Sequence, residues 1–191
     1  MNQAEQIEKA VRLLKKGEVI ACATDTVYGL LADPQDASAI EKIFLLKGRS
    51  LAKPLQILVS DAKSARSLIE IPFQYHYLTK HWPGGLTVIG KRKLSTALGV
   101  GTKKTLGIRV PAGKTMQLLL RKYGASLAAT SANPTGQPDA KSKADVKHYF
   151  GERIFVLTAD SEVQTGRGST VVDISLNRAK IIRQGALRIW L

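Results

Sequence analysis

The sequence predicts a single-domain α/β fold, in which a twisted and mostly buried mixed sheet is flanked by helices. Three observations support this prediction. Amphipathic helical segments alternate with short apolar segments along the whole chain. Several of the apolar segments lack polar–apolar alternation, which is typical of strands covered on both faces. Finally, 191 residues are enough for one hydrophobic core and too few for two ordinary domains, so we expect one domain over residues 1–191.

The N-terminal segment sets this pattern. Over residues 3–16 apolar side chains recur every three or four positions, which predicts an amphipathic helix that ends at Gly17. The continuous apolar segment 19–23 predicts a buried strand. Asp36 can cap a second helix, which we expect to run to about Leu46.

The same alternation continues to the C-terminus. The stretch from Thr170 to Arg183 predicts a hairpin around Leu176-Asn177 and therefore a mixed sheet. The further strands are expected at 55–59, 86–90, 106–110, 127–130, 154–157, 170–174 and 181–183, and the further helices at 62–69, 73–80, 116–123 and 144–150.

The composition restricts the class of partner and the compartment. Lys and Arg number 29 against 15 acidic residues, a formal charge of +14, which favours anionic partners such as nucleotides, RNA or acidic lipids. A basic protein without such a partner explains the charge equally well. Because the N-terminus is polar and no apolar segment could cross a bilayer, we expect a cytoplasmic protein without a membrane partner.

Cysteine and histidine usage argues against a protein-held metal. Cys22 is the only cysteine, so neither an internal disulfide nor a zinc cluster can form. His76 and His81 are five positions apart and would not share a helix face. We therefore predict no metal site built from side chains.

The segment GIRVPAGKT at residues 107–115 is similar to a phosphate-binding P-loop. However, five residues separate its two glycines, where a P-loop has four, and Pro111 would interrupt the converging N–H groups. We predict instead a strand that ends near Val110, a turn, and a helix that begins near Lys114. Arg109 then lies at a strand end, where α/β sheets place their ligands.

Four polar or cationic clusters also lie at the ends of predicted elements. Each alone is compatible with a structural role, such as a side-chain turn, a helix-dipole contact or a surface loop. Their shared position at strand edges predicts that they meet in one cleft. The clusters are TDTVYG at 24–29, KGR at 47–49, TSANPTG at 130–136 and GRGST at 166–170.

The order of these motifs resembles the YrdC/Sua5 family over about residues 5–185. The resemblance includes KPL at 53–55, PGGLT at 83–87, GIRVP at 107–111 and GSTVVD at 168–173. It implies a YrdC-like twisted sheet around an open basic cleft, similar to the fold of DHBP synthase. It also implies the short form, without the additional C-terminal domain of longer Sua5 proteins. Ala23, Ser50 and Gly85 replace prolines of the family pattern, which affects the expected loop geometry.

The resemblance further implies an activity. A nucleotidyltransferase would join L-threonine, bicarbonate and ATP into threonylcarbamoyl-AMP and pyrophosphate, with Mg²⁺ arriving on the ATP. The product would serve the threonylcarbamoyl (t6A) modification of adenosine 37 in tRNA, through a transferase complex of the TsaD, TsaB and TsaE type. Direct contact with tRNA would be an additional partnership.

The resemblance also assigns roles to residues in these motifs. Cations would neutralise the phosphates, short polar side chains would hydrogen-bond the nucleotide, and Arg109 would pair with the threonine carboxylate through two hydrogen bonds. Alanine at Lys47 or Ser131 should then abolish turnover with little change in melting temperature. The implied catalytic residues are Lys47, Arg49, Ser131 and Asn133; the ATP site adds Thr105 and Arg183 to these four; and the threonine site comprises Thr26, Arg109 and Ser169.

Two alternatives remain open at this point. The charge and the lysine-rich segments 91–93 and 103–104 are compatible with a non-catalytic factor for tRNA or rRNA maturation, although aromatic residues for base stacking are few at 6%. The same cleft could also serve a related ATP-dependent carbamoylation or nucleotidyl transfer on a different amine.

Overall fold

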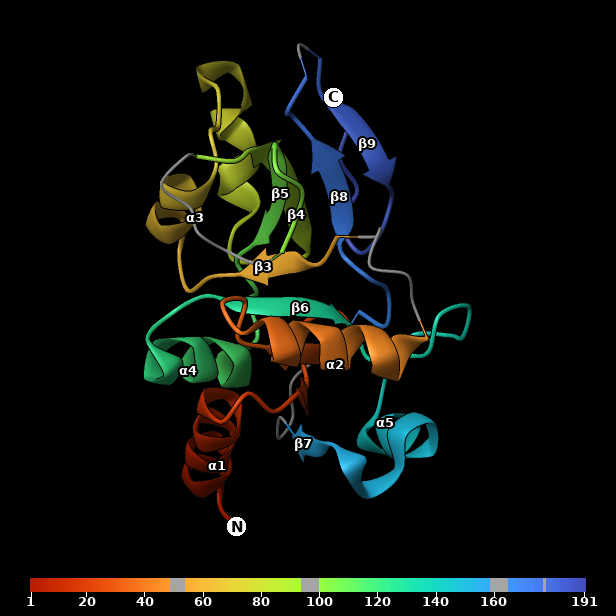
Figure 1. The fold of residues 1–191 in the computed structure, drawn as a ribbon. Coiled ribbons are helices and arrows are strands. Elements are labelled where there is room, and N and C mark those ends of the chain that lie inside the picture. The colour runs from red at the N-terminus through yellow and green to blue at the C-terminus, as the bar shows by residue number, and fades with distance from the viewer. Residues whose placement is uncertain (49–53, 94–99, 159–164, 177) are drawn as a thin grey trace.

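The computed structural model describes residues 1–48, 54–93, 100–158, 165–176 and 178–191. One mixed sheet runs through the molecule (Figure 1), and within these ranges its nine strands follow the order β7-β1-β2-β6-β3-β5-β4-β8-β9. The strands are β1 Ile20–Cys22, β2 Gly29–Ala32, β3 Gln56–Leu58, β4 Leu86–Lys91, β5 Thr105–Arg109, β6 Leu127–Ser131, β7 Phe155–Leu157, β8 Thr170–Asp173 and β9 Lys180–Arg183.

The helices pack on both faces of this sheet. No helix among the described residues is long and apolar enough to cross a membrane. The α-helices are α1 Gln3–Lys15, α2 Ala37–Lys47, α3 Ala62–Leu68, α4 Lys114–Tyr123 and α5 Lys143–Phe150, and the 3₁₀ helices are η1 Phe73–His81 and η2 Gly151–Arg153.

Helix α2 shows how local sequence places a side chain of the later site. The Asp36 carboxylate accepts a hydrogen bond from the Ala39 N–H at 3.1 Å and caps the first turn, as predicted. Gly48 ends the helix in the left-handed conformation, with φ at 55°, which glycine adopts at little cost. Lys47 is therefore the last helical residue, and its position is set by the cap geometry.

Strand alternation divides the sheet into two faces. In β5, Leu106 and Ile108 point into the core that α2, α3 and α5 cover, while Thr105, Gly107 and Arg109 point to the opposite face. Over β1, β2 and β6 that opposite face is covered by α1 and α4. Over β4, β5 and β8 the same face lines a cavity instead.

The predicted fold class is confirmed, including the mixed sheet and the antiparallel pairing of β8 with β9. The strand pairs β1–β7, β3–β5 and β4–β8 are parallel, and the remaining pairs are antiparallel. The expected hairpin residue Asn177 lies outside the described residues.

Two elements differ from the prediction. Strand β2 was not expected, because its four residues directly follow a polar turn and are too few to show a period; it nevertheless pairs with β1 and β6 and is fully buried. The segment expected as a helix over 73–80 is the 3₁₀ helix η1. Leu78 is its only buried residue, so it lacks the apolar stripe that stabilises an α-helix.

Candidate functional site

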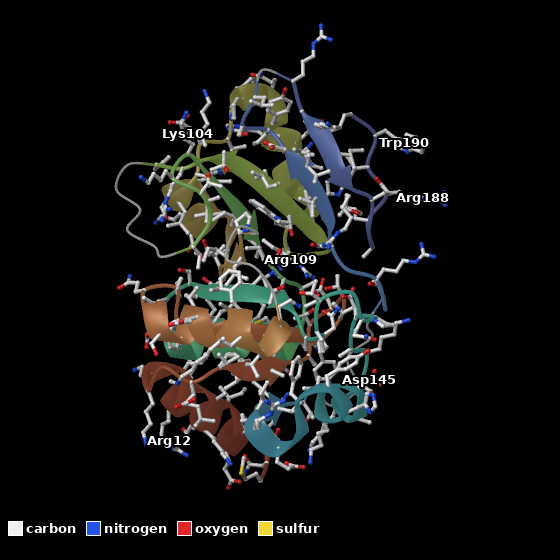
Figure 2. All side chains as sticks on the ribbon, turned by 45° about the vertical axis from the view of Figure 1, so that its right-hand side comes forward. Arg12, Lys104, Arg109, Asp145, Arg188 and Trp190 are labelled. Atoms are coloured by element: carbon white, nitrogen blue, oxygen red, sulfur yellow. The ribbon has the colours of Figure 1, made fainter. Side chains whose placement is uncertain are left out.

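One cavity of about 430 Å³ lies on the exposed face of β4, β5 and β8. Figure 2 shows Arg109 at the middle of the molecule, between β6 and the strands above it. Arg49, one of the predicted site residues, lies outside the described residues. All the other predicted site residues line this single cavity: Thr26, Lys47, Thr105, Arg109, Ser131, Asn133, Ser169 and Arg183.

Lys47 reaches the cavity from the end of α2. Its ammonium group donates to the Ser131 and Asn133 carbonyl oxygens, both at 2.7 Å, and to the Asn133 side-chain oxygen at 3.1 Å. The side chain is almost completely buried, with 4% exposed. Such a buried cation needs several acceptors to offset the loss of hydration, and here the loop after β6 supplies them.

The loop after β6 also uses its own polar groups. The Ser131 hydroxyl donates to the Asn133 side-chain oxygen at 2.6 Å, and the Asn133 amide donates to the Gln137 carbonyl. The Ser131 hydroxyl proton and one of the two N–H groups of the Asn133 amide, which the family resemblance assigns to ATP, are thus engaged locally. A nucleotide would have to exchange these bonds for its own.

Arg109 holds a different set of partners on the opposite side of the cavity. Its guanidinium donates to the Thr26 hydroxyl at 2.7 Å, to the Asp25 carboxylate at 2.7 Å and to the Gly84 carbonyl at 3.0 Å. Burial lowers the pKa of Arg109, and the neighbouring Asp25 charge opposes that effect. Of the five guanidinium N–H groups, these bonds use three, which leaves two for a ligand.

Asp25 is a residue of this site that the sequence prediction did not include. Besides Arg109, its carboxylate accepts from the Ala112 N–H at 3.1 Å and so connects the turn after β5 to the loop after β1. The TDT motif drew attention to Asp25, but its pairing across the sheet is a long-range contact. The alternative structural role proposed for this motif does apply to Thr24, whose hydroxyl donates to the Val27 carbonyl at 2.6 Å.

Ser169 is held by residues from three strands. The Arg183 guanidinium donates to the Ser169 carbonyl at 2.9 and 3.0 Å, and its Nη2 lies 3.3 Å from the Ser169 hydroxyl. That hydroxyl is 2.8 Å from the Thr87 hydroxyl, which in turn donates to the Gln56 side-chain oxygen at 2.8 Å. Thr87 and Gln56 also line the cavity and were not predicted. Thr87 falls in the PGGLT motif, whereas no motif marks Gln56.

Thr105 begins β5 at the edge of the cavity. Its hydroxyl lies 2.8 Å from the Thr102 hydroxyl, so it too takes part in a local turn. The charged residues that line the described cavity are Lys47, Arg109, Arg183 and Asp139. Because 49–53 lie outside the described residues, the basic character of the whole cleft stays a prediction.

The segment similar to a P-loop is structurally a strand and a helix, as predicted. Gly107 lies within β5, Gly113 is the N-cap of α4, and Lys114 begins that helix with an exposed side chain. Within the described ranges no three His, Cys, Asp or Glu side chains are close enough to hold a metal ion.

Comparisons with known proteins agree with this geometry. The family model Sua5/yciO/yrdC, described as "Telomere recombination", matches residues 12–185. A threonylcarbamoyl-AMP synthase of Pyrococcus abyssi is 32% identical over 98% of this chain and 57% of its own length. A protein of the same name from Vibrio vulnificus (strain YJ016) is 29% identical over 94% of this chain and 98% of its own length.

A solved structure gives the same result at the level of the fold. The crystal structure of P. abyssi Sua5 complexed with L-threonine superposes with a TM-score of 0.88 at 30% identity, and the match covers 97% of this chain and 55% of that one. The chain therefore spans about half the length of the P. abyssi relative and almost all of the Vibrio relative.

Proposed function

The chain belongs to the Sua5/YciO/YrdC family, and we propose that it is a threonylcarbamoyl-AMP synthase. The observation that carries this proposal is that one cavity collects polar and cationic side chains from loops and elements far apart in the sequence. Relatives at about 30% identity over most of the chain bear this name. The reaction joins L-threonine, bicarbonate and ATP and releases pyrophosphate and water.

The two sets of cavity residues suit the two larger substrates. The two remaining N–H groups of Arg109 could hold the carboxylate of threonine, with Thr26 and Ser169 beside it. Lys47 and Arg183, with Arg49, would neutralise the ATP phosphates, and Ser131, Asn133 and Thr105 would contact the nucleotide. Mg²⁺ would enter bound to the phosphates, whose oxygens would supply most of its ligands, because Asp139 is the only carboxylate that lines the described cavity.

The chemistry requires positioning more than proton transfer. The threonine nitrogen forms a bond to the bicarbonate carbon with loss of water, giving a carbamate. A carbamate oxygen then bonds to the α-phosphorus of ATP as the bond to pyrophosphate breaks. The negative charge that gathers on the phosphates needs fixed cations, and the buried Lys47 ammonium together with the Arg183 and Arg49 guanidinium groups would supply them.

The biological setting belongs to the same proposal. Threonylcarbamoyl-AMP would pass to a threonylcarbamoyl transferase complex that modifies adenosine 37 of tRNA in the cytoplasm. Direct binding of tRNA to this chain is not needed for the reaction.

A direct assay tests the proposal. Purified protein is incubated with ATP, Mg²⁺, bicarbonate and each amino acid in turn, and pyrophosphate release is followed together with the mass of the product. We expect release that depends on threonine and bicarbonate. Absence of threonine-dependent release would overturn the proposal, and release with another amine would support the alternative carbamoylation.

A further inference from the structure

A chain of hydrogen bonds runs along the floor of the cavity through Gln56, Thr87, Ser169 and Arg183. These four residues lie in β3, in β4, directly before β8, and in β9. Thr87 and Ser169 are nearly completely buried, at 3% and 2% exposed, so water contributes little to their hydrogen bonding. The order of donors and acceptors within the chain can therefore be worked out from the protein groups.

Each hydroxyl has a single proton to donate. Thr87 gives its proton to the Gln56 side-chain oxygen, so in the 2.8 Å contact with Ser169 it is the Ser169 hydroxyl that donates. Arg183 has only donors, and its Nη2 donates to the Ser169 hydroxyl oxygen. The proton of Ser169 is thus committed to Thr87, and the hydroxyl can only accept a hydrogen bond from a ligand in the cavity.

The strand register places Thr87, the hydrogen-bond partner of Ser169, opposite Arg109. Thr87 lies directly opposite Arg109 in the antiparallel β4–β5 pair, and both residues line the cavity. Side chains opposite each other in such a pair are separated by about 5 Å at Cβ. A group on the α-carbon of a ligand whose carboxylate is held by Arg109 would therefore come within reach of Ser169.

We infer that Gln56 and Thr87 are positioning residues that hold the Ser169 hydroxyl as an acceptor for the α-amino group of the substrate. This inference rests on the proposed function, since it assumes an amino acid in the cavity. An amino group would donate a hydrogen bond to the Ser169 oxygen. A carbonyl oxygen in the same place has no proton to donate, and its lone pair would face that of the Ser169 oxygen. This order of hydrogen bonds thereby selects amino acids over the corresponding oxo acids.

A matched ligand pair tests the selection. In equilibrium binding, 2-aminobutanoate and 2-oxobutanoate, which differ only at the α-carbon, are added as competitors of radiolabelled L-threonine. For the parent protein we expect 2-oxobutanoate to bind at least about tenfold more weakly, because a group facing an unpaired buried partner loses about that much affinity.

Two substitutions should reduce this discrimination by about tenfold. Thr87→Val removes the hydroxyl that accepts the Ser169 proton, so Ser169 can donate to a ligand. Gln56→Met removes the acceptor of the Thr87 proton, so Thr87 can donate to Ser169 and the Ser169 proton again becomes available to a ligand. Thr87→Ser keeps the hydroxyl and should retain the parent ratio. Thr115→Val, a buried threonine in α4 away from the cavity, controls for the loss of a buried hydroxyl.

The outcomes separate the two proposals. An unchanged ratio of the two competitors in both Thr87→Val and Gln56→Met would overturn this inference and leave the proposed function intact. Loss of the ratio in Thr115→Val as well would also overturn it, because the effect would then follow from stability. No threonine binding by the parent protein would overturn the proposed function and the inference together.

Discussion

The two sides of the cavity are built differently. The loop side, comprising Lys47, Ser131 and Asn133, is held by hydrogen bonds between the end of α2, the last residue of β6 and the loop that follows it. The strand side, comprising Thr87, Arg109, Ser169 and Arg183, is held by residues of neighbouring strands and the loops beside them.

This difference has a consequence for ligand binding. Groups on the strand side keep their positions as long as the sheet keeps its register, so they are preorganised for a substrate. Groups on the loop side already donate hydrogen bonds to one another, so a nucleotide would have to compete with these bonds. We therefore expect substitutions on the strand side to affect affinity and folding together, and those on the loop side to be better tolerated by the fold.

The largest effect is expected for Arg109→Ala. It removes the proposed carboxylate ligand and leaves the Asp25 carboxylate, with 17% of its side chain exposed, without its ion-pair partner. Threonine-dependent pyrophosphate release should fall more than about 100-fold, and removing one partner of a buried pair costs about 3–5 kcal/mol of stability. Urea denaturation and the release assay measure the two losses separately.

A double substitution separates these two losses. Asp25→Ala combined with Arg109→Ala removes the unpaired carboxylate, so stability should recover in part while activity stays lost. Recovery of activity in the double variant would show that Arg109 serves only the fold, and would contradict its placement in the threonine site.

A smaller effect is expected for Lys47→Met on the loop side. The three oxygens that accept from the ammonium lose their charged donor, which should cost about 1–3 kcal/mol and raise the KM for ATP about tenfold or more. The expectation from sequence that the melting temperature would hardly change is thus revised for Lys47. Differential scanning calorimetry and ATP titration measure both effects.

Lys42→Met is a matched control on the same helix. Lys42 contacts Glu18 and the Gly17 carbonyl at the surface, with 40% of its side chain exposed, so its loss should cost well under about 1 kcal/mol. An equal loss of stability in both lysine variants would remove the distinction between the loop-side cation and a surface cation.

The same contrast explains what sequence could predict. Lys47, Ser131 and Asn133 lie in short motifs that end a helix or a strand, where local rules place glycine turns and polar side chains. On the strand side, Arg109 was found because it ends a recognisable strand, and Ser169 was assigned by the family resemblance of the GSTVVD motif. Asp25 and Gln56 were missed because their roles arise only from pairing between distant segments, which no local pattern encodes.

The fold shows the same limit. Helix α2 was predicted with its cap, because Asp36 and Gly48 act on neighbouring backbone groups. Strand β2 was missed because it is stabilised by β1 and β6, which come from before and far after it in the chain. Propensity is too weak over four residues to reveal such a strand.

Ser131→Ala should have a still smaller effect on the fold. It removes one hydrogen bond to Asn133, whose side-chain oxygen keeps its bond to Lys47, so about 1 kcal/mol of stability should be lost. Turnover should nevertheless fall about tenfold or more if this hydroxyl contacts ATP. Ser67→Ala, which removes an exposed hydroxyl in α3, provides the matched control. Unchanged turnover in Ser131→Ala would assign that hydroxyl to the loop alone.

The smallest effect is expected at Asp61, which caps α3 outside both sides of the cavity. Hydrogen bonding from the Ser64 N–H lowers the pKa of this carboxyl below its ordinary value of 3.8. Its folded-state pKa therefore lies below its unfolded-state pKa, so its contribution to stability is complete above about pH 4 and is lost as the pH falls through the folded-state pKa. Asp61→Asn keeps a capping oxygen that does not titrate. At neutral pH its free energy of unfolding, measured with urea, should be lower than that of the parent by a few tenths of a kcal/mol, and this difference should disappear on acidification.

Because α3 contributes no residue to the cavity lining, the threonine and ATP affinities of Asp61→Asn should equal those of the parent. A shift of either affinity in Asp61→Asn would mean that stability changes alone move the binding constants, and the losses expected at Lys47 and Arg109 would then need correction for that effect.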